Sequence, residues 1–576
     1  MAKSILHIQV GNSITRAQAL QVGDGKITPK AYGLCPTPSL TLEEDRTQGI
    51  GFAIQQMEER MAEQGASLEP QEILVTLSVG GEPSAVCAGV VKGISGESAK
   101  RAALSAGATV TDLICIDDGR EDFQRVSDLS RQDISVVVLA GGVDAEIMES
   151  GSHQLLSIAK ILAQGLPKKH GSQKKVPLIY AASLDAREEV MRIMGDDIEI
   201  IWADNVRSRL EEEHLESARN AVVDAFAQSV GLDGRFSGLG RLGSPQVLPS
   251  GYAKGMGVER LYSESKENVL GFSLDGDSVQ VFSYIGGVFT RTVTSIDAVD
   301  SRKVAKWLPT PSLTGNLEEM LANLRLHPWI VPAGWDELAV YLAFWKEVIR
   351  EGIAEHKESA IELRGIQRPR KIDETFEVRV SGGDTILKAH DIRKVVVTGV
   401  LSHILSERAL LSLIMDGANL SGVTAIYRDP WDVLPVVGSL SPGNVSIEDH
   451  LKSLGVLVGP GQDRDRVGTR WVFSGTGSSL EPLPVRPNEI VPVDLNGGGE
   501  IDIVLEPSRT EDLGNGKGHK VWARVASGFT QVYLDGRPRT MIRSVERIAA
   551  QDILKWYGNL GVFPQEVLSA WSGGRA

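Results

Sequence analysis

Residues 269–283, VLGFSLDGDSVQVFS, decide the fold of this 576-residue chain. They predict a short apolar strand, a small-residue turn around Gly276 and a second strand that carries hydroxyl groups. An earlier stretch, residues 5–17 (ILHIQVGNSITRA), has the same pattern around Gly11. Glycine lets backbone N–H groups approach a phosphate, and Ser or Thr hydroxyls can donate to it. One such turn is typical of any β-hairpin, but two in different halves of the chain indicate a duplicated nucleotide-binding cradle.

Each half also contains a later apolar strand that ends in glycine. Residues 133–144 (DISVVVLAGGVD) lead into Gly142, and residues 391–402 (DIRKVVVTGVLS) lead into Thr398 and Gly399. A continuous apolar strand is typical of a parallel sheet covered on both faces, and α/β folds bind ligands beyond the carboxyl ends of such strands. We therefore expect the two strands to occupy equivalent places in the two halves.

Segments with strand-like and helix-like patterns alternate through most of the chain, which predicts an α/β fold with a parallel sheet core. Residues 237–250 are rich in Gly, Ser and Pro and predict a boundary loop. After about Glu481, short alternating segments separated by prolines predict antiparallel strands of a small barrel or sandwich, closed by a helix over residues 544–556. We expect a first half at 1–245, a second half at 246–460 and a β-rich C-terminal extension at 461–576.

The composition narrows the class of protein. The formal net charge is −15, from 75 acidic and 60 basic residues, which argues against a nucleic-acid-binding protein. The three cysteines, Cys35, Cys87 and Cys115, lack metal-ligand spacing and fit a reducing cytoplasm. The N-terminal residues lack the apolar core of a signal peptide, and no run approaches the ~18 apolar residues of a membrane helix. We expect a cytoplasmic protein without a membrane span.

The duplicated pattern resembles the actin, sugar-kinase and Hsp70-type ATPase fold. Within it, several segments are similar to the glutamate mutase accessory proteins called GlmL or MutL, which are distinct from the mismatch-repair protein of that name. The resemblance covers about residues 3–445. The segments that carry it are VTLSVGGEPSAVCAGVVKGISGESAKRAALSAGATV, VVVLAGGVDAE, IYAASLDAREEV, IIWADNVRSRLEEEHLESARNAVVDAF, VVVTGVLSHIL and DPWDVLPVVGSLS.

Two departures from the family pattern affect catalysis. The resemblance implies a leading aspartate in each glycine turn, which holds magnesium through water and orients the attacking water, but Gln9 and Ser273 stand there instead. Neither side chain supplies the negative charge that balances a metal ion. Asp275 and Asp277 lie in the second turn, where their charge would repel a phosphate without a metal. We therefore expect no catalytic residue, no metal site and inefficient ATP hydrolysis, and we leave the role of magnesium open.

The retained groups still predict a cradle that binds ATP or ADP weakly; a cleft that serves only packing is the alternative. A small-molecule kinase would need a catalytic acid, and Asp144 is the best candidate, although a helix cap explains it better. The expected nucleotide-binding residues are Gly11, Ser13, Thr15, Gly142, Asp275, Gly276, Ser278, Thr398 and Gly399.

The family resemblance also implies a function and a partner. Such a protein assists an adenosylcobalamin-dependent mutase as a reactivating chaperone, and nucleotide-linked opening of its two halves would expel damaged cofactor. The sequence itself contains no cobalamin-binding motif. The alternative is a non-catalytic pseudo-ATPase scaffold that keeps the fold and binds a protein partner through its C-terminal extension; the lost aspartates favour it.

Overall fold

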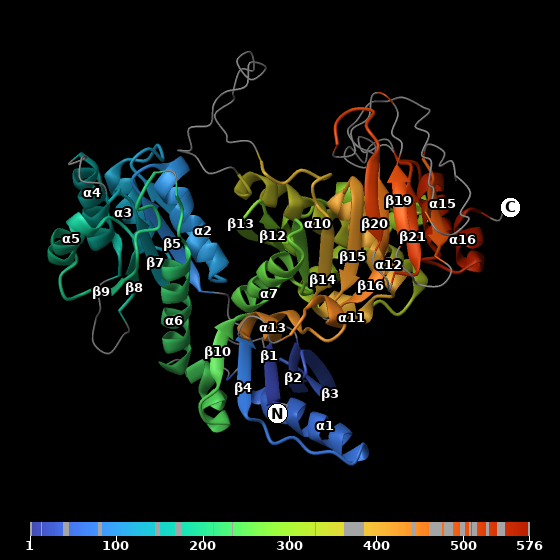
Figure 1. Ribbon diagram of the computed structural model, residues 1–576, viewed down its shortest axis with the longest axis horizontal. Coiled ribbons are helices and arrows are strands. Elements are labelled where there is room, and N and C mark those ends of the chain that lie inside the picture. The colour runs from blue at the N-terminus through green and yellow to red at the C-terminus, as the bar shows by residue number, and fades with distance from the viewer. Residues whose placement is uncertain are drawn as a thin grey trace.

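The computed structural model describes the chain from Lys3 to Gly573 with gaps, and Figure 1 shows how its elements are arranged. The strands within the described ranges form four sheets, and the two glycine turns lie in two different sheets. The residues left undescribed within that span are 13, 38–44, 46, 79–82, 145–149, 168–174, 211, 233, 329, 362–384, 441–444, 460–474, 477–487, 496–500, 506–508, 510–514, 526–528 and 538–547.

The first-half sheet has the strand order β10-β4-β1-β2-β3. Strands β1, β2 and β3 form an antiparallel meander. Strand β4 runs parallel to β1, and β10 runs parallel to β4. Helix α1 (Gln48–Glu63) packs on β3 and β2 through Ile50, Ala53, Met57 and Met61, which recur at helical spacing. The strands are β1 (Lys3–Val10), β2 (Ile14–Gly23), β3 (Lys26–Pro36), β4 (Glu72–Leu77) and β10 (Gln246–Pro249).

The second half repeats this sheet strand for strand. Its order β13-β12-β11-β14-β15 contains the same antiparallel meander, with β14 parallel to β11 and β15 parallel to β14. The repetition of order and direction confirms the predicted duplicated, actin-like α/β fold. The strands are β11 (Val269–Leu274), β12 (Ser278–Ile285), β13 (Val288–Ser295), β14 (Lys394–Thr398) and β15 (Gly422–Arg428).

A third, wholly parallel sheet is inserted between β4 and β10, with the order β6-β5-β7-β8-β9. It lies apart from the first-half sheet in Figure 1. Its strands are β5 (Ser84–Gly89), β6 (Thr109–Cys115), β7 (Val136–Ala140), β8 (Pro177–Tyr180) and β9 (Glu199–Trp202). Its helices are η1 (Lys92–Gly96), α2 (Glu97–Ser105), α3 (Asp122–Ser130), α4 (Ser150–Gly165), η2 (Leu184–Ala186), α5 (Arg187–Met194) and α6 (Glu216–Leu232).

This insertion corrects one expectation. The strand that precedes Gly142 is β7 of the inserted sheet, so it is not the counterpart of the strand that precedes Gly399. The counterpart of β14 is β4, because β4 pairs in parallel with β1 as β14 does with β11. Both β7 and β14 are buried apolar strands that end in glycine, and that local pattern does not tell which sheet a strand joins.

Two crossing helices connect the halves. Helix α7 (Ser250–Ser265) leads from β10 into β11, and α13 (Leu434–Ser439) follows β15; Figure 1 shows both between the two duplicated sheets. A Cβ atom on Gly438 would lie 2.4 Å from the Ala253 carbonyl oxygen, and one on Gly257 would lie 2.6 Å from the Leu434 oxygen. The helices can approach this closely only because both positions are glycine. The expected boundary loop at 237–250 instead contains part of the 3₁₀ segment η3 (Gly234–Leu242) and all of β10.

Helices of the second half cover its sheet and bury the largest hydrophobic core. The longest, α10 (Trp335–Ser359), packs on β12, β13 and α12, and every residue from Ala339 to Ile349 is buried, so this part of the helix is enclosed on all sides. The other elements are η4 (Ile296–Ala298), α8 (Ser301–Ala305), η5 (Pro311–Thr314), α9 (Leu317–Leu326), α11 (Val400–Ile404), α12 (Glu407–Ala418) and η7 (Glu448–His450).

The C-terminal extension is β-rich, as predicted, but part of it continues the second-half sheet. Strand β16 pairs with β15, β21 pairs in parallel with β16, and β18 pairs with β21, which gives a sheet of eight strands. The other described strands of the extension form a three-stranded antiparallel sheet rather than a closed barrel. Strand β16 (Lys452–Gly459) precedes the extension, whose elements are β17 (Gly475–Thr476), β18 (Ile490–Asp494), β19 (Ile501–Leu505), β20 (Val521–Val525), β21 (Gln531–Asp535), α15 (Ala550–Leu560) and α16 (Gln565–Trp571).

A buried ion cluster joins the extension to the second half. Arg537 Nη1 lies 2.6 Å from Asp416 Oδ1, and Arg537 Nη2 lies 2.8 Å from Asp535 Oδ2. Lys346 of α10 shares Asp416 at 2.7 Å and contacts the hydroxyl of Tyr557 at 3.0 Å. The extension therefore packs as part of the second half. Among the helices that the structure describes, none has the length and apolar character needed to cross a membrane.

Candidate functional site

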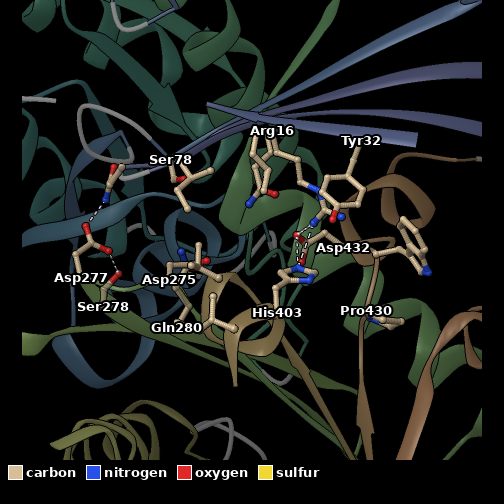
Figure 2. A pocket seen from close by; sticks show the side chains of 18 of the residues that line it. Arg16, Tyr32, Ser78, Asp275, Asp277, Ser278, Gln280, His403, Pro430 and Asp432 are labelled. Atoms are coloured by element: carbon tan, nitrogen blue, oxygen red, sulfur yellow. Dashed lines mark hydrogen bonds and ion pairs between the residues drawn. The ribbon is translucent and has the colours of Figure 1, made fainter. Parts of the chain in front are cut away.

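A cavity of about 620 Å³ lies where the two duplicated halves meet. Both glycine turns open onto it, as do β2, β3 and the residues that follow β15. Figure 2 shows Asp277 and Ser278 of the second turn on one side and Asp432, His403 and Pro430 on the other. The lining residues are Gln9, Gly11, Asn12, Ile14, Arg16, Tyr32, Leu34, Ser78, Thr109, Asp275, Asp277, Ser278, Gln280, Val293, Val400, His403, Ile404, Arg428, Pro430, Trp431 and Asp432.

The structure brings part of the predicted set to this cavity. Gly11, Asp275 and Ser278 line it. Gly276 lies in the same turn as Asp275, with a positive φ of 91° that favours glycine. Gly399 packs against the second turn so closely that a Cβ atom there would lie 2.7 Å from the backbone of Leu274 and 2.8 Å from Asp275 Oδ1. The second turn and the end of β14 therefore lie in direct contact.

Other predicted residues lie elsewhere. The hydroxyl of Thr15 is buried and pairs with Thr37 at 2.8 Å, outside the cavity lining. Ser13 lies outside the described residues. Gly142 belongs to the inserted sheet, where its carbonyl accepts a hydrogen bond from Asn205 at 3.1 Å. Asp144 lies outside the cavity lining, and its Oδ1 accepts a hydrogen bond from the N–H of Leu184, the first residue of η2, at 3.0 Å.

A buried lysine occupies the floor of the second turn. Lys254 comes from α7 and is 1% exposed. Its Nζ lies 2.7 Å from Ser273 Oγ and 3.1 Å from both carboxylate oxygens of Asp275, while the Ser273 hydroxyl donates to Asp275 Oδ2 at 2.6 Å. Ser273 stands where the family resemblance implies the second aspartate. It belongs to a Lys254–Ser273–Asp275 network in which each side chain contacts the other two.

Asp277 links the two turns across the cleft. Asn12 of the first turn donates to its Oδ2, and the Ser278 hydroxyl donates to its Oδ1 at 3.0 Å. Burial raises the pKa of Asp277, and the negative charge of Asp275 raises it further. The hydrogen bond from Asn12 acts in the opposite direction and is outweighed. Taking this carboxylate out of water therefore disfavours its charged form.

A second link across the cleft joins Arg16 of β2 to residues of the second half. Arg16 Nη1 lies 2.5 Å from Asp432 Oδ2 and 3.1 Å from His403 Nε2, and His403 lies 2.9 Å from the same carboxylate oxygen. Thr398, one of the predicted residues, donates its hydroxyl to Asp432 Oδ1 at 2.7 Å. Figure 2 shows Arg16, His403 and Asp432 converging.

The two acids after β15 have opposite pKa shifts. Burial works to raise the pKa of Asp432, but the charges of His403 and Arg16 outweigh it and hold the pKa well below its usual range. Burial and the charge of Asp432 raise the pKa of Asp429 to about 6. Asp429 accepts hydrogen bonds from the N–H groups of Val433 at 2.9 Å and Leu434 at 3.0 Å, so it caps the start of α13.

Aromatic rings form the wall beside Arg16. Tyr32 and Trp431 meet edge to face with their ring centroids 6.0 Å apart, and Arg16 and Arg60 both lie over the ring of Tyr32. The Gln18 amide of the first half donates to the Trp431 carbonyl at 2.7 Å. Such rings can stack with a planar base.

The cavity also connects to the inserted sheet. Gln280 lines the cavity, and its Oε1 accepts a hydrogen bond from Arg291 Nη2 at 3.0 Å. Arg291 is 1% exposed, and its Nη1 donates to the carbonyl of Ala108 at 3.1 Å, just after α2. The Gly251 backbone of α7 packs against the same guanidinium, since a Cβ atom there would lie 2.3 Å from it.

These groups fit a nucleotide better than they fit a tightly held metal. Carboxylate oxygens suit magnesium, but a cation at Asp275 would compete with Lys254, and Asp277 is already bonded to Asn12 and Ser278. Sequence reasoning missed Lys254, His403 and Arg428. It also missed Asp432, although this acid follows a buried parallel strand at its carboxyl end, which is a recognisable signal.

Comparison with known proteins identifies a family that matches most of the chain. The family model described as MutL protein matches residues 5–451. Protein MutL of Clostridium tetanomorphum is 26% identical over 227 residues, which are 39% of this chain and 44% of that protein. The match thus spans less than half of that relative's length.

Two solved structures share remote similarity. Gluconate kinase from Lactobacillus acidophilus has a TM-score of 0.31 at 11% identity, over 80% of this chain and 94% of that one. A glycerol dehydratase reactivase has a TM-score of 0.28 at 11% identity, over 72% of this chain and 95% of that one. The fold assignment rests on the repeated strand order, and the family assignment rests on the match over residues 5–451. The chain belongs to the MutL protein family.

Proposed function

We propose that this chain is an accessory protein that reactivates an adenosylcobalamin-dependent mutase, and that its cleft binds ATP or ADP with little hydrolysis. The observation that carries the proposal is family membership combined with a cavity that both duplicated halves line. The two halves, at about 1–245 and 246–460, are the moving bodies, except that β10 (Gln246–Pro249) moves with the first half, whose sheet it joins. The extension at 461–576 moves with the second half. Nucleotide-linked opening of the halves would expel damaged cofactor from the mutase.

Slow hydrolysis follows from the side chains at the two turns. Phosphoryl transfer depends on positioning and on neutralising the charge that develops on the phosphate. Gln9 and Ser273 replace the carboxylates that would organise magnesium and water there, and Ser273 is already bonded to Lys254 and Asp275. We therefore expect nucleotide binding that depends weakly on magnesium, and turnover near background.

Calorimetry with ATP and ADP, each with and without magnesium, tests the nucleotide part of this proposal. The expected result is binding that changes little when magnesium is removed. Robust magnesium-dependent ATPase activity would contradict the mechanism, because it would show that Asp275 or Asp277 performs the lost role. Absence of binding would mean that the cleft serves only packing.

Affinity capture with the tagged full-length chain from its native cytoplasm tests the partner. Recovery of a cobalamin-dependent mutase supports the accessory role. The alternative, a non-catalytic scaffold, is favoured by one observation: Arg16 and Lys254, two cations of the cleft, are bonded to the chain's own carboxylates. Capture of other proteins without any mutase would favour that scaffold.

A further inference from the structure

Lys254 is a buried cation whose hydrogen-bonding capacity is used at the second turn. Its side chain is 1% exposed, and an ammonium has three N–H donors. Three acceptors lie within reach of its Nζ: Ser273 Oγ at 2.7 Å and the two carboxylate oxygens of Asp275 at 3.1 Å each. A buried ammonium is stable only when it is paired and hydrogen-bonded, and this one is. Lys254 is therefore held as a fixed positive charge of the folded chain.

Close packing of α7 sets the point from which this side chain enters the turn. A Cβ atom on Gly251 would lie 2.3 Å from the guanidinium of Arg291, and one on Gly255 would lie 2.8 Å from the ring of Phe289. The helix backbone on both sides of Lys254 is thus held against its neighbours. The ammonium cannot be displaced far from the turn unless α7 itself shifts.

The charge of Lys254 acts on groups of both duplicated halves. Burial acts to raise the pKa of Asp432, which follows β15 in the second half, and the charge of Lys254 is one of those that lower it. Burial lowers the pKa of His7, on β1 of the first half, to about 4, and the charge of Lys254 acts in the same direction. One ammonium thus influences both halves, as a cation bound between the two turns would.

A divalent cation does not fit beside this ammonium. Magnesium holds its oxygen ligands at about 2.0–2.1 Å in an octahedral arrangement. Bound to Asp275, it would lie next to an ammonium that contacts both carboxylate oxygens, and the like charges would repel each other. Asp277 already accepts hydrogen bonds from Asn12 and Ser278. The described part of the chain also contains no group of three or more His, Cys, Asp or Glu side chains that could hold a metal ion.

We propose that the Lys254 ammonium takes the place of a divalent cation at the second turn, so that the cleft excludes metal ions and binds its ligand without one. The single positive charge of Lys254 balances the single negative charge of Asp275. The aspartate that the family resemblance implies at position 273 would instead need a metal ion as its counter-charge. The exclusion of metal does not depend on the ligand, and only the metal-free binding of a nucleotide rests on the proposed function.

Titration of the full-length chain with Mn²⁺ alone, followed by electron paramagnetic resonance of the free ion, tests this assignment. In the wild type and in Ser273→Asp we expect no Mn²⁺ site that depends on Asp275, because Lys254 pairs with either carboxylate. Ser273→Asp combined with Lys254→Met should gain one site and bind Mn²⁺ roughly tenfold more tightly or better, since ligand charge sets the affinity of such sites. Adding Asp275→Asn to that pair should abolish the gain.

Lys303 provides the matched control, because it is an exposed lysine of the same half that pairs with Glu351. Ser273→Asp combined with Lys303→Met should gain no Mn²⁺ site. Circular dichroism melting checks that each variant folds. If Ser273→Asp with Lys254→Met folds but gains no site, the proposal is wrong and the lysine only fills space.

Two further outcomes would overturn the proposal even if the variant without Lys254 did not fold. One is a new Mn²⁺ site in Ser273→Asp alone, and the other is a wild-type site that Asp275→Asn removes. Titration of the wild type with ADP, in EDTA and in magnesium, separates this proposal from the proposed function. ADP that binds only with magnesium would overturn metal-free binding. ADP that binds under neither condition would refute nucleotide binding, while the Mn²⁺ titrations would still decide the role of Lys254.

Discussion

Arg16 and Asp432 come from opposite halves, and both are largely buried, with side-chain exposures of 10% and 4%. Asp432→Asn would leave the Arg16 guanidinium in the cleft without its full counter-charge. Breaking a buried ion pair by removing one partner typically costs about 3–5 kcal/mol of unfolding free energy. We expect a loss in that range in urea unfolding monitored by circular dichroism. Asp300→Asn, in the exposed pair with Arg302, should leave stability unchanged, and equal effects of the two variants would contradict this account.

His356 gives stability a dependence on pH. It is fully buried between Thr292 at 2.9 Å and Ser283 at 2.8 Å, and burial lowers its pKa from 6.5 to about 3. Between these two pH values the unfolded chain binds a proton that the folded chain does not, so stability falls as the pH drops through this window. The slope from one such residue is about 1.4 kcal/mol per pH unit.

Urea unfolding between pH 6 and pH 4 measures that slope. His356→Gln should be less stable at pH 7 because the packing changes, yet its dependence on pH should be shallower by about 1.4 kcal/mol per unit. His153→Gln, at an exposed position of α4, should keep the full slope. An unchanged slope in His356→Gln would show that the imidazole is protonated in the folded protein.

Single residues of the site were predictable only where the sequence is locally distinctive. The turn glycines and Asp275 are visible because a small-residue turn separates two apolar strands. Arg16 and Asp432 lie 416 positions apart in sequence, and neither neighbourhood reveals the other. Lys254 sits in a helix whose pattern indicates only packing. Pairings made by tertiary structure between distant segments carry no local signal.

At the scale of elements, the crossing of α7 and α13 depends on two glycines. Gly257→Ala or Gly438→Ala would place a Cβ within 2.6 Å or 2.4 Å of a backbone oxygen, so the helices must move apart. Overpacking of this kind typically costs about 1–3 kcal/mol.

Thermal unfolding of both variants checks this cost. The matched control is Gly231→Ala in α6, where a Cβ meets open space. Because alanine favours helix, that control should gain up to about 1 kcal/mol. If all three variants showed the same change in stability, close packing would not be the interaction that stabilises the crossing of α7 and α13.

The type of most elements followed from the sequence, but their partners did not. Runs such as residues 394–398 and 136–140 are recognisable strands because β-branched residues fill them. Their membership of different sheets is set by hydrogen bonds to strands far away in the chain. The same limit explains why β18 and β21, read as part of a separate barrel, continue the second-half sheet.

At the scale of the whole molecule, the C-terminal extension should unfold together with the second half. Arg537 is fully buried and serves both Asp416 of α12 and Asp535 of β21. Arg537→Met leaves those carboxylates without their shared cation, which should lower stability by roughly 3–5 kcal/mol. Hydrogen exchange should show protection falling in β16 and β21 alike.

Arg302→Met provides the comparison, because that arginine is 87% exposed and pairs with Asp300, two positions before it in the chain. It should leave exchange in both strands unchanged. If protection fell in β21 while β16 kept its own, the extension would be a separately folding unit and the shared sheet would contribute little to its stability.

The inserted sheet has a consequence for the order of events during synthesis. Gln246 of β10 pairs opposite Leu74 of β4, about 170 residues earlier in the chain. At the usual pace of roughly 5–20 residues per second, a ribosome needs roughly 10–30 s between these two strands. During that interval the edge of β4 is unpaired and able to capture another strand. The inserted α/β segment therefore has time to fold first, and the nascent first half stays open until β10 emerges to close it.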